Sequence, residues 1–241
     1  MRWDRAVYLA GACAGGALLC GCPNPNTYGT PRTLDPGKIE VQISGEGFAA
    51  NANGASAAAP TLPTAGIRYG VADGFDFGAR VTNMSGLGID GKIRLLKGTV
   101  DLALDPGVQA FYYAISASSS AGTTSGSSSE SIFISYLHLP LLVGINFSQA
   151  ASLVLTPGVF GALASGTVTS SSGASSSQSI FSGTGFGGRF GLGINIRTSK
   201  AVSLQPEVTA MHEFNDSNVW IYVFGFGVNF VNGPDYSDIG Q

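Results

Sequence analysis

Alternation between apolar and polar or small residues recurs through most of this chain, and it limits the folds that the sequence can adopt. Residues 220–230 show it most clearly. Large apolar side chains occupy every second position there: Trp220, Tyr222, Phe224, Phe226, Val228 and Phe230. Gly225, Gly227 and Asn229 lie between them. Because successive side chains of a β-strand point to opposite faces, this period predicts strands rather than helices.

The same alternation recurs in residues 39–46, 74–82, 87–95 and 186–196. Together with the turn signals between them, these patterns predict ten strands near 38–49, 62–71, 74–82, 86–96, 100–116, 131–147, 151–166, 180–197, 201–214 and 219–230. Tight turns are expected at Asp73-Gly74, Lys97-Gly98, Ser148-Gln149 and Ser199-Lys200. Looser loops are expected at 50–61, 83–85, 117–130, 167–179 and 215–218, and the serine-rich ones should be mobile.

Composition indicates which face of these strands meets water. Only 11% of residues are charged, and those charges fall largely on one strand face and in the turns. A transmembrane barrel turns its apolar face outward to lipid and its polar or small face to the lumen. The sequence therefore predicts an all-β, antiparallel up-and-down transmembrane barrel over residues 38–230, with ten strands, or eight if the first pair is misassigned. A lipid-tethered, soluble periplasmic β-sandwich is the alternative from another class.

Two short motifs repeat along the expected strands. Residues 102–108, 153–159 and, more loosely, 202–208 share a Leu-x-Leu-x-Pro core. A Gly-x-Asn tetrad recurs at 144–147, 193–196 and 227–230. Repetition of this kind predicts that hairpins of one design follow one another around the barrel. Because proline cannot donate to a ladder, we expect bulges or weakened pairing at each proline.

The N-terminus has the pattern of a secretory signal, with Arg2 and Arg5 followed by an apolar run too short to span a membrane. Its end, Leu19-Cys20-Gly21-Cys22, resembles the lipobox of bacterial lipoproteins, and Cys20 fits that pattern less well than Cys22. The resemblance implies a signal peptide over 1–21, lipid attachment at Cys22, and lipoprotein processing enzymes as partners. Removal of the signal leaves one cysteine, so no intrachain disulfide is expected. Residues 22–37, rich in proline, are predicted to be a lipidated periplasmic tether.

Two stretches carry a resemblance to the bacterial outer membrane β-barrel family of small porin-like and OmpA-like proteins. Residues 136–142 (YLHLPLL) resemble a strand of that family, and Gly225, Val228 and Phe230 resemble its assembly signal. The chain departs from that signal by continuing for residues 231–241, expected to be a periplasmic tail. The resemblance implies the outer membrane of a Gram-negative bacterium, with outer-membrane lipid and the barrel insertion machinery as partners. An even strand number predicts that both termini are periplasmic.

Projecting the alternation inward predicts a lumen of nearly balanced charge. The expected lumenal residues are Glu40, Glu46, Asp76, Asp90, Asp105 and Glu207 with Arg68, Arg80, Lys92, Arg94 and Arg189. A barrel of this size has an interior that its own side chains about fill, and unpaired buried charges are costly. We therefore expect a salt-bridged, largely closed lumen. A selective pore would instead show a ring of one sign.

Few residues have the chemistry of a catalytic or metal site. His138 and His212 have no histidine or cysteine partner at metal-ligand spacing, and His212 and its neighbour Glu213 should point to opposite faces. The glycine-rich stretch 183–193 lacks the ending of a phosphate-binding loop, and a net charge of −3 excludes a basic nucleic-acid surface. The sequence thus predicts no cofactor, no metal and no enzyme.

The predicted function is that of a non-enzymatic outer-membrane lipoprotein with a surface or envelope-structural role. A narrow channel or small-solute transporter is the alternative, and a barrel hydrolase is a weaker third. The sequence does not identify a surface ligand.

Overall fold

The computed structural model describes residues 24–52, 55–61, 63–82, 86–121, 124–172, 174–214 and 219–240. Its strands are β1 (Ile39–Ala52), β2 (Ala55–Pro60), β3 (Thr64–Ala72), β4 (Phe75–Thr82), β5 (Gly86–Leu96), β6 (Val100–Leu104), β7 (Gly107–Ala121), β8 (Thr124–Ser148), β9 (Ala151–Ser172), β10 (Ala174–Arg197), β11 (Val202–Glu213) and β12 (Val219–Val231). Among the described residues, no helix is long and apolar enough to cross a membrane.

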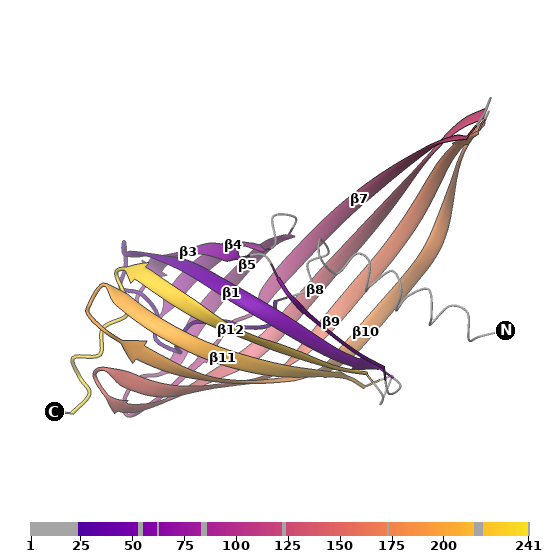
Figure 1. Cartoon of the computed structure of the whole chain (residues 1–241). Helices are drawn as coiled ribbons and strands as arrows, with labels where there is room; N and C mark the ends of the chain where they lie inside the picture. The colour runs from indigo at the N-terminus through magenta and orange to yellow at the C-terminus, as the bar shows by residue number, and fades with distance from the viewer. Residues whose placement is uncertain are drawn as a thin grey trace.

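The strands form one antiparallel barrel that is closed by pairing of β1 with β12 (Figure 1). β6 and β7 follow one another along a single wall position, since both pair with β5 on one side and β8 on the other. β2 pairs only with the far half of β1 and adds no wall position. The barrel therefore has ten strands, which confirms the predicted fold and excludes the eight-stranded alternative.

The prolines of the Leu-x-Leu-x-Pro repeat interrupt the ladder, as predicted. Pro106 separates β6 from β7. The β8–β9 pairing is interrupted between the pairs Pro140–Gly158 and Val143–Leu155, beside Pro157, and resumes in the same register. The β10–β11 pairing is interrupted in the same way beside Pro206. Each break follows from the missing backbone N–H of proline.

The two serine-rich loops are not loops in the structure. Strands β7 to β10 continue through them, and the two hairpins project well beyond the rest of the wall (Figure 1). Ser116 pairs with Ser129, and Ser127 pairs with Ser171, so the four strands remain one sheet. The expectation of loops at 117–130 and 167–179 is wrong for the described residues of these stretches, because they include no proline and an antiparallel ladder needs only backbone groups.

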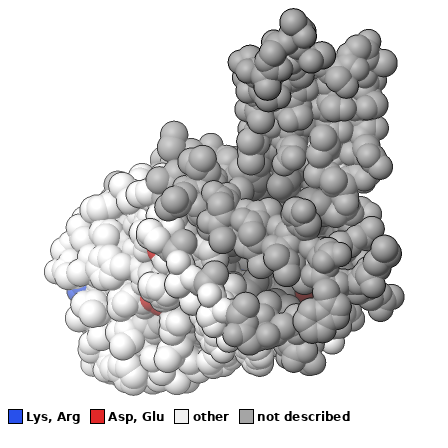
Figure 2. All heavy atoms as spheres, turned by 45° about the vertical axis from the view of Figure 1, so that its right-hand side comes forward, with Lys and Arg blue, Asp and Glu red and all other residues white. Residues whose placement is uncertain are grey.

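The barrel is apolar outside and polar inside. Exposed side chains on the outer face include Phe224 and Phe226 of β12 and Phe190 and Ile194 of β10. Charged atoms are scarce on the described surface in Figure 2. The most deeply buried side chains of the wall include Asp76, Asp101 and Gln205. A water-soluble barrel has the opposite polarity, so this is a membrane-spanning β-barrel.

Candidate functional site

Residues 24–34, hereafter the lumenal segment, lie inside the barrel. Their hydrogen-bond partners come from seven strands of the wall: β1, β4, β5, β6, β7, β11 and β12. Nearly every residue of the segment is buried. The predicted tether is therefore wrong for these residues. Four prolines in 23–37 prevent a strand or helix, and this leaves the segment's backbone groups free to bond to lumenal side chains.

The lumenal segment runs from the middle of the barrel to the end that carries the tight turns. At its start, Asn24 exchanges two hydrogen bonds with Gln109 of β7, at 3.1 and 2.7 Å, and donates to Glu46 of β1 at 2.9 Å. At its other end, the Leu34 N–H donates to Asp76, close to the β3–β4 turn. The segment thus lies lengthwise in the half of the lumen that is next to the tight turns, the end of the barrel at which β1 begins.

One wall carboxylate, that of Glu207, holds the centre of the segment. The backbone N–H groups of Thr27 and Tyr28 donate to the two oxygens of Glu207, at 3.0 and 2.8 Å. Among the described residues other than glycine, Tyr28 alone has a positive φ, of 46°. This strained conformation costs about 1–3 kcal/mol, and the paired amide bonds to Glu207 keep the backbone in it.

Glycines of the wall make the space that the segment occupies. Glu46 and Glu207 both face Gly225 in the register of β12. A Cβ on Gly225 would collide with the Tyr28 hydroxyl, and a Cβ on Gly227 would lie 2.6 Å from the Tyr28 Cβ. Gly144 has the same relation to Pro31, at 3.0 Å. The Gly-x-Asn tetrads at 144–147 and 227–230 therefore provide room for the lumenal segment.

The last residues of the chain, 232–240, close the tight-turn end of the barrel; we refer to them as the C-terminal tail. Tyr236 is 5% exposed, and its hydroxyl bonds to Thr30 Oγ1 at 2.6 Å. Arg32 binds Asp238 and donates to the Asp235 carbonyl, while its Nε bonds to Asp101 at 2.7 Å. Arg32 therefore joins the segment, the tail and the barrel wall.

Ionisation in the C-terminal tail follows these contacts. The hydrogen bond from Arg32 lowers the pKa of Asp238 below its usual value. Burial raises the pKa of Tyr236 to about 12, against the opposing charge of Arg197, whose guanidinium lies 3.5 Å from the ring centre. The contact between Arg32 and Asp238 is therefore charged over the physiological pH range.

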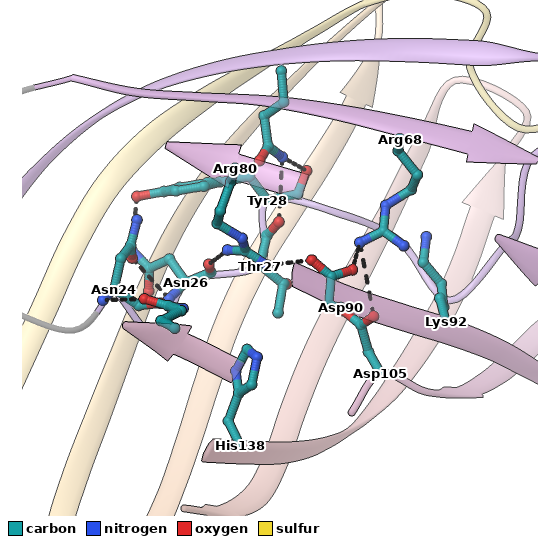
Figure 3. Close-up of polar contacts among 12 residues, drawn as sticks. Asn24, Asn26, Thr27, Tyr28, Arg68, Arg80, Asp90, Lys92, Asp105 and His138 are labelled. Atoms are coloured by element: carbon teal, nitrogen blue, oxygen red, sulfur yellow. Dashed lines mark hydrogen bonds and ion pairs between the residues drawn. The ribbon is translucent and has the colours of Figure 1, made fainter. Parts of the chain in front are cut away.

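One sector of the wall holds a cluster of ion pairs. Arg68 of β3 binds Asp76 and Asp90 and lies 3.7 Å from Asp105. Arg80 pairs with Asp90 at 3.1 Å, and its other nitrogen donates to the Asn26 carbonyl of the lumenal segment at 3.0 Å, as Figure 3 shows. Two further pairs, Lys92 with Asp76 at 3.7 Å and Arg94 with Asp73 at 2.7 Å, extend the cluster to the tight-turn end.

The expectation that all lumenal charges pair with one another is wrong for four residues. Within the described part of the chain, Glu40, Glu46, Glu207 and Arg189 form no ion pair. Glu46 and Glu207 accept hydrogen bonds from the lumenal segment instead. The reason is that a segment of main chain occupies the lumen, and its amide donors stand where basic side chains were expected. All the predicted lumenal charges nevertheless lie on the inner face.

Two charged residues of the lumen were not predicted. Arg32 is 1% exposed and Asp101 is 0% exposed, and Asn146 also donates to Asp101 at 2.6 Å. Asp101 follows a tight turn and so has a lumenal position by alternation, a signal present in the sequence. Arg32 lies in a segment without periodicity, which gives no such signal.

The remaining candidate residues have structural positions. His212 stacks on Trp220 at 4.4 Å on the outer face, while the Glu213 carboxylate lies beside Gly185, so the two side chains diverge as predicted. Val228 and Phe230 lie half-buried on the outer face of β12. No group of three or more metal-ligating side chains gathers among the described residues. Cys22, Cys20 and the signal peptide of residues 1–21 lie outside the described residues.

Among known proteins, this chain resembles solved structures of outer-membrane barrels. No protein-family model and no curated protein matches the sequence. The translocator domain of the autotransporter NalP from Neisseria meningitidis is 12% identical, with 95% of each chain covered and a TM-score of 0.47. The Escherichia coli outer membrane protease OmpT is 9% identical, with 82% and 98% covered and a TM-score of 0.45. Neisserial surface protein A is 13% identical, with 80% and 96% covered and a TM-score of 0.39. At these scores, the strand pairing described above remains the evidence for the fold.

Proposed function

We propose that this protein is a non-enzymatic outer-membrane β-barrel lipoprotein with a structural or surface role, whose lumen is closed by its own N-terminal segment. The supporting observation is that residues 24–34 lie buried inside the barrel. Their hydrogen bonds reach seven strands of the wall, from β1 and β4 to β11 and β12, and the C-terminal tail packs against the end of the segment near the tight turns. The proposal places the tight-turn end and the tail in the periplasm, because short turns face the periplasm in barrels of this kind.

Closure by a main-chain segment differs from closure by side chains alone. The paired charges of Arg68, Arg80 and Asp90 occupy one sector of the lumen, and Glu46 and Glu207 occupy another. The lumenal segment lies between these sectors, since Asn26 bonds to Arg80 while Thr27 bonds to Glu207. The lumen therefore has room for a stretch of polypeptide between the two groups of charges, and residues 24–34 of the same chain fill it.

A narrow channel is the second candidate. A cavity of about 430 Å³ lies at the tight-turn end, between the tail and residues such as Lys92, Asn195 and Arg197. A second cavity, between Thr27, Gln42 and Arg80, has a volume of only about 20 Å³. The larger cavity favours a vestibule for a solute, and the small volume of the second favours a closed lumen. A conductance measurement therefore discriminates a channel from a closed barrel.

The test is single-channel recording of the refolded mature chain with Cys22→Ser, using preparations whose mobility on gels changes with heating. We expect a silent bilayer. A variant lacking residues 24–34 should give stable openings that favour cations, because Glu46 and Glu207 then lose the donors of the segment and face an open lumen. Discrete openings in the undeleted chain would reject the closed barrel. A folded deletion variant that stays silent would show that side chains, rather than the segment, close the lumen.

A further inference from the structure

Glu40, at the start of β1, is a buried carboxylate without a partner. It is 8% exposed, and among the described residues it forms no hydrogen bond and no ion pair. Glu46 and Glu207, by contrast, accept hydrogen bonds from the lumenal segment. An ionised carboxylate that is withdrawn from water is costly unless it is paired. The charge of Glu40 therefore requires a partner that the described chain does not supply.

The basic residues near Glu40 already bind other groups. Arg68 stands opposite Glu40 in the register of β1 and β3, but its guanidinium binds aspartates. Lys92 donates to the Arg32 carbonyl at 3.0 Å and lies 3.7 Å from Asp76. In the ion-pair cluster, part of which Figure 3 shows, cations and carboxylates are equal in number: Arg68, Arg80, Lys92 and Arg94 with Asp73, Asp76, Asp90 and Asp105. Glu40 is therefore a negative charge in excess of a balanced cluster.

Glu40 lines the cavity of about 430 Å³ at the tight-turn end of the barrel. Cavities that bind small molecules have volumes of about 300–1,000 Å³. The lining extends from the buried Glu40 to residues 199–201, which are exposed in the turn between β10 and β11. Residues 233–237 of the C-terminal tail border it, at the end where Figure 1 shows the tail. A small solute can therefore reach Glu40 from this end of the barrel.

The other residues of the cavity indicate which kind of cation fits. Leu34 and Pro234 contribute apolar surface, while the amides of Asn195 and Asn229 already donate to other groups of the protein. A hard metal ion such as calcium takes six to eight oxygen ligands, and within the described residues no group of three metal-ligating side chains gathers. An ammonium group on a short carbon chain needs one carboxylate and some apolar surface, which this cavity provides.

We propose that this cavity binds a small organic amine, whose ammonium group pairs with the Glu40 carboxylate. The amine enters from the tight-turn end, and its carbon chain lies against the apolar part of the lining. Binding requires no passage through the barrel, because the contacts that hold the lumenal segment at Glu207 lie elsewhere. Failure of this site would therefore leave the proposed closure of the lumen unaffected, and conductance tests that closure separately.

The test is isothermal titration calorimetry of the refolded full-length mature protein in a non-ionic detergent at about pH 8, where an alkylammonium is charged. We expect saturable binding of n-butylammonium and none of 1-butanol or butyrate, which have the same carbon chain without a positive charge. Potassium chloride at equal ionic strength should not compete. Absence of n-butylammonium binding, or equal binding of 1-butanol, would overturn the proposal, and competition by potassium would replace the amine with a metal ion.

Three variants make the test specific. Glu40→Gln should weaken n-butylammonium binding by more than about tenfold, because the ammonium loses its buried counter-charge. Glu213→Gln makes the same chemical change at the far end of β11 and should retain binding. Ser203→Phe leaves Glu40 intact but fills the cavity that Ser203 lines, so it should also abolish binding. Binding that survives either Glu40→Gln or Ser203→Phe would overturn the site, and water in the cavity would then hydrate Glu40.

Discussion

Tyr28 of the lumenal segment packs directly on Gly227 of β12, 199 residues later in the chain; a Cβ on Gly227 would lie 2.6 Å from the Tyr28 Cβ and 2.7 Å from its Cγ. Asn229, the next lumenal residue of β12, donates to the Tyr28 carbonyl at 2.8 Å. The last strand of the barrel is therefore shaped to receive the segment that precedes the first strand.

Substitution of Gly227 tests this fit. Gly227→Val should displace the Tyr28 ring, because the space beside backbone and ring atoms cannot widen, and the lumen should then conduct. Planar-bilayer recording measures the effect. The matched control is Gly183→Val in β10, where a Cβ would meet no atom within 4 Å. A folded Gly227→Val protein that stays closed would show that the Tyr28 contact does not hold the segment.

Glu207 and Glu40 are both buried without an ion pair, but removing their charges should change the stability of the protein differently. Glu207→Ala leaves the Thr27 and Tyr28 amides without acceptors and should lower the free energy of unfolding by about 1–3 kcal/mol. Glu40→Gln removes a buried charge that forms no ion pair, so it should be neutral or stabilising. Chemical denaturation of both variants in detergent compares them. Equal losses would contradict the assigned role of Glu207.

Arg32 should be the most sensitive position of the lumenal segment. Its side chain binds Asp101 on the wall and Asp238 on the tail, and it is 1% exposed. Arg32→Gln leaves Asp101 buried without its cation, for which we expect a loss of about 3–5 kcal/mol. The double variant with Asp101→Asn removes the stranded charge and should recover part of that loss. Without any recovery, the destabilisation would have to arise from packing.

Acid should release the C-terminal tail. The pKa of Asp238 is lower in the folded protein than in the unfolded chain, where it is about 3.9. The contact with Arg32 therefore stabilises the fold above that unfolded value, and this contribution disappears as pH falls through the folded pKa. We expect an effect of modest size, since Asp238 is partly exposed. Melting temperatures between pH 7 and pH 3 should fall less in Asp238→Asn, and identical curves would refute the linkage.

Lipid attachment is testable by metabolic labelling with radioactive palmitate. Cys22→Ser should abolish incorporation, and Cys20→Ser should not. Asn24, the first described residue, lies two positions after Cys22, a span of about 7 Å at most. Comparing the conductance of acylated and Cys22→Ser proteins therefore shows whether the segment stays seated beside an attached lipid. We expect the Cys22→Ser protein to be closed, and openings in the acylated protein alone would mean that the anchor withdraws the segment.

Alternation in the sequence determined the barrel. Residues such as Phe224, Phe226 and Gly225 assign their faces by position alone, because a strand has a side-chain period of two. The proline repeats likewise predicted where the ladders break, since a missing N–H acts locally. The inward direction of the charged residues followed from composition instead, because a chain with only 11% charged residues is expected to turn its apolar strand face to lipid.

Only the tertiary structure decided how the lumen is closed. Residues 24–34 have no periodicity, and the hydrogen bonds that hold them join positions such as Thr27 and Glu207, separated by 180 residues. No local pattern encodes a contact of that range. The same holds for the pair of Arg32 with Asp238, and for Arg189, which has no carboxylate within ion-pair distance in the described chain. Charge balance is a property of the whole sequence. Pairing, however, depends on distances that exist only after the barrel has closed.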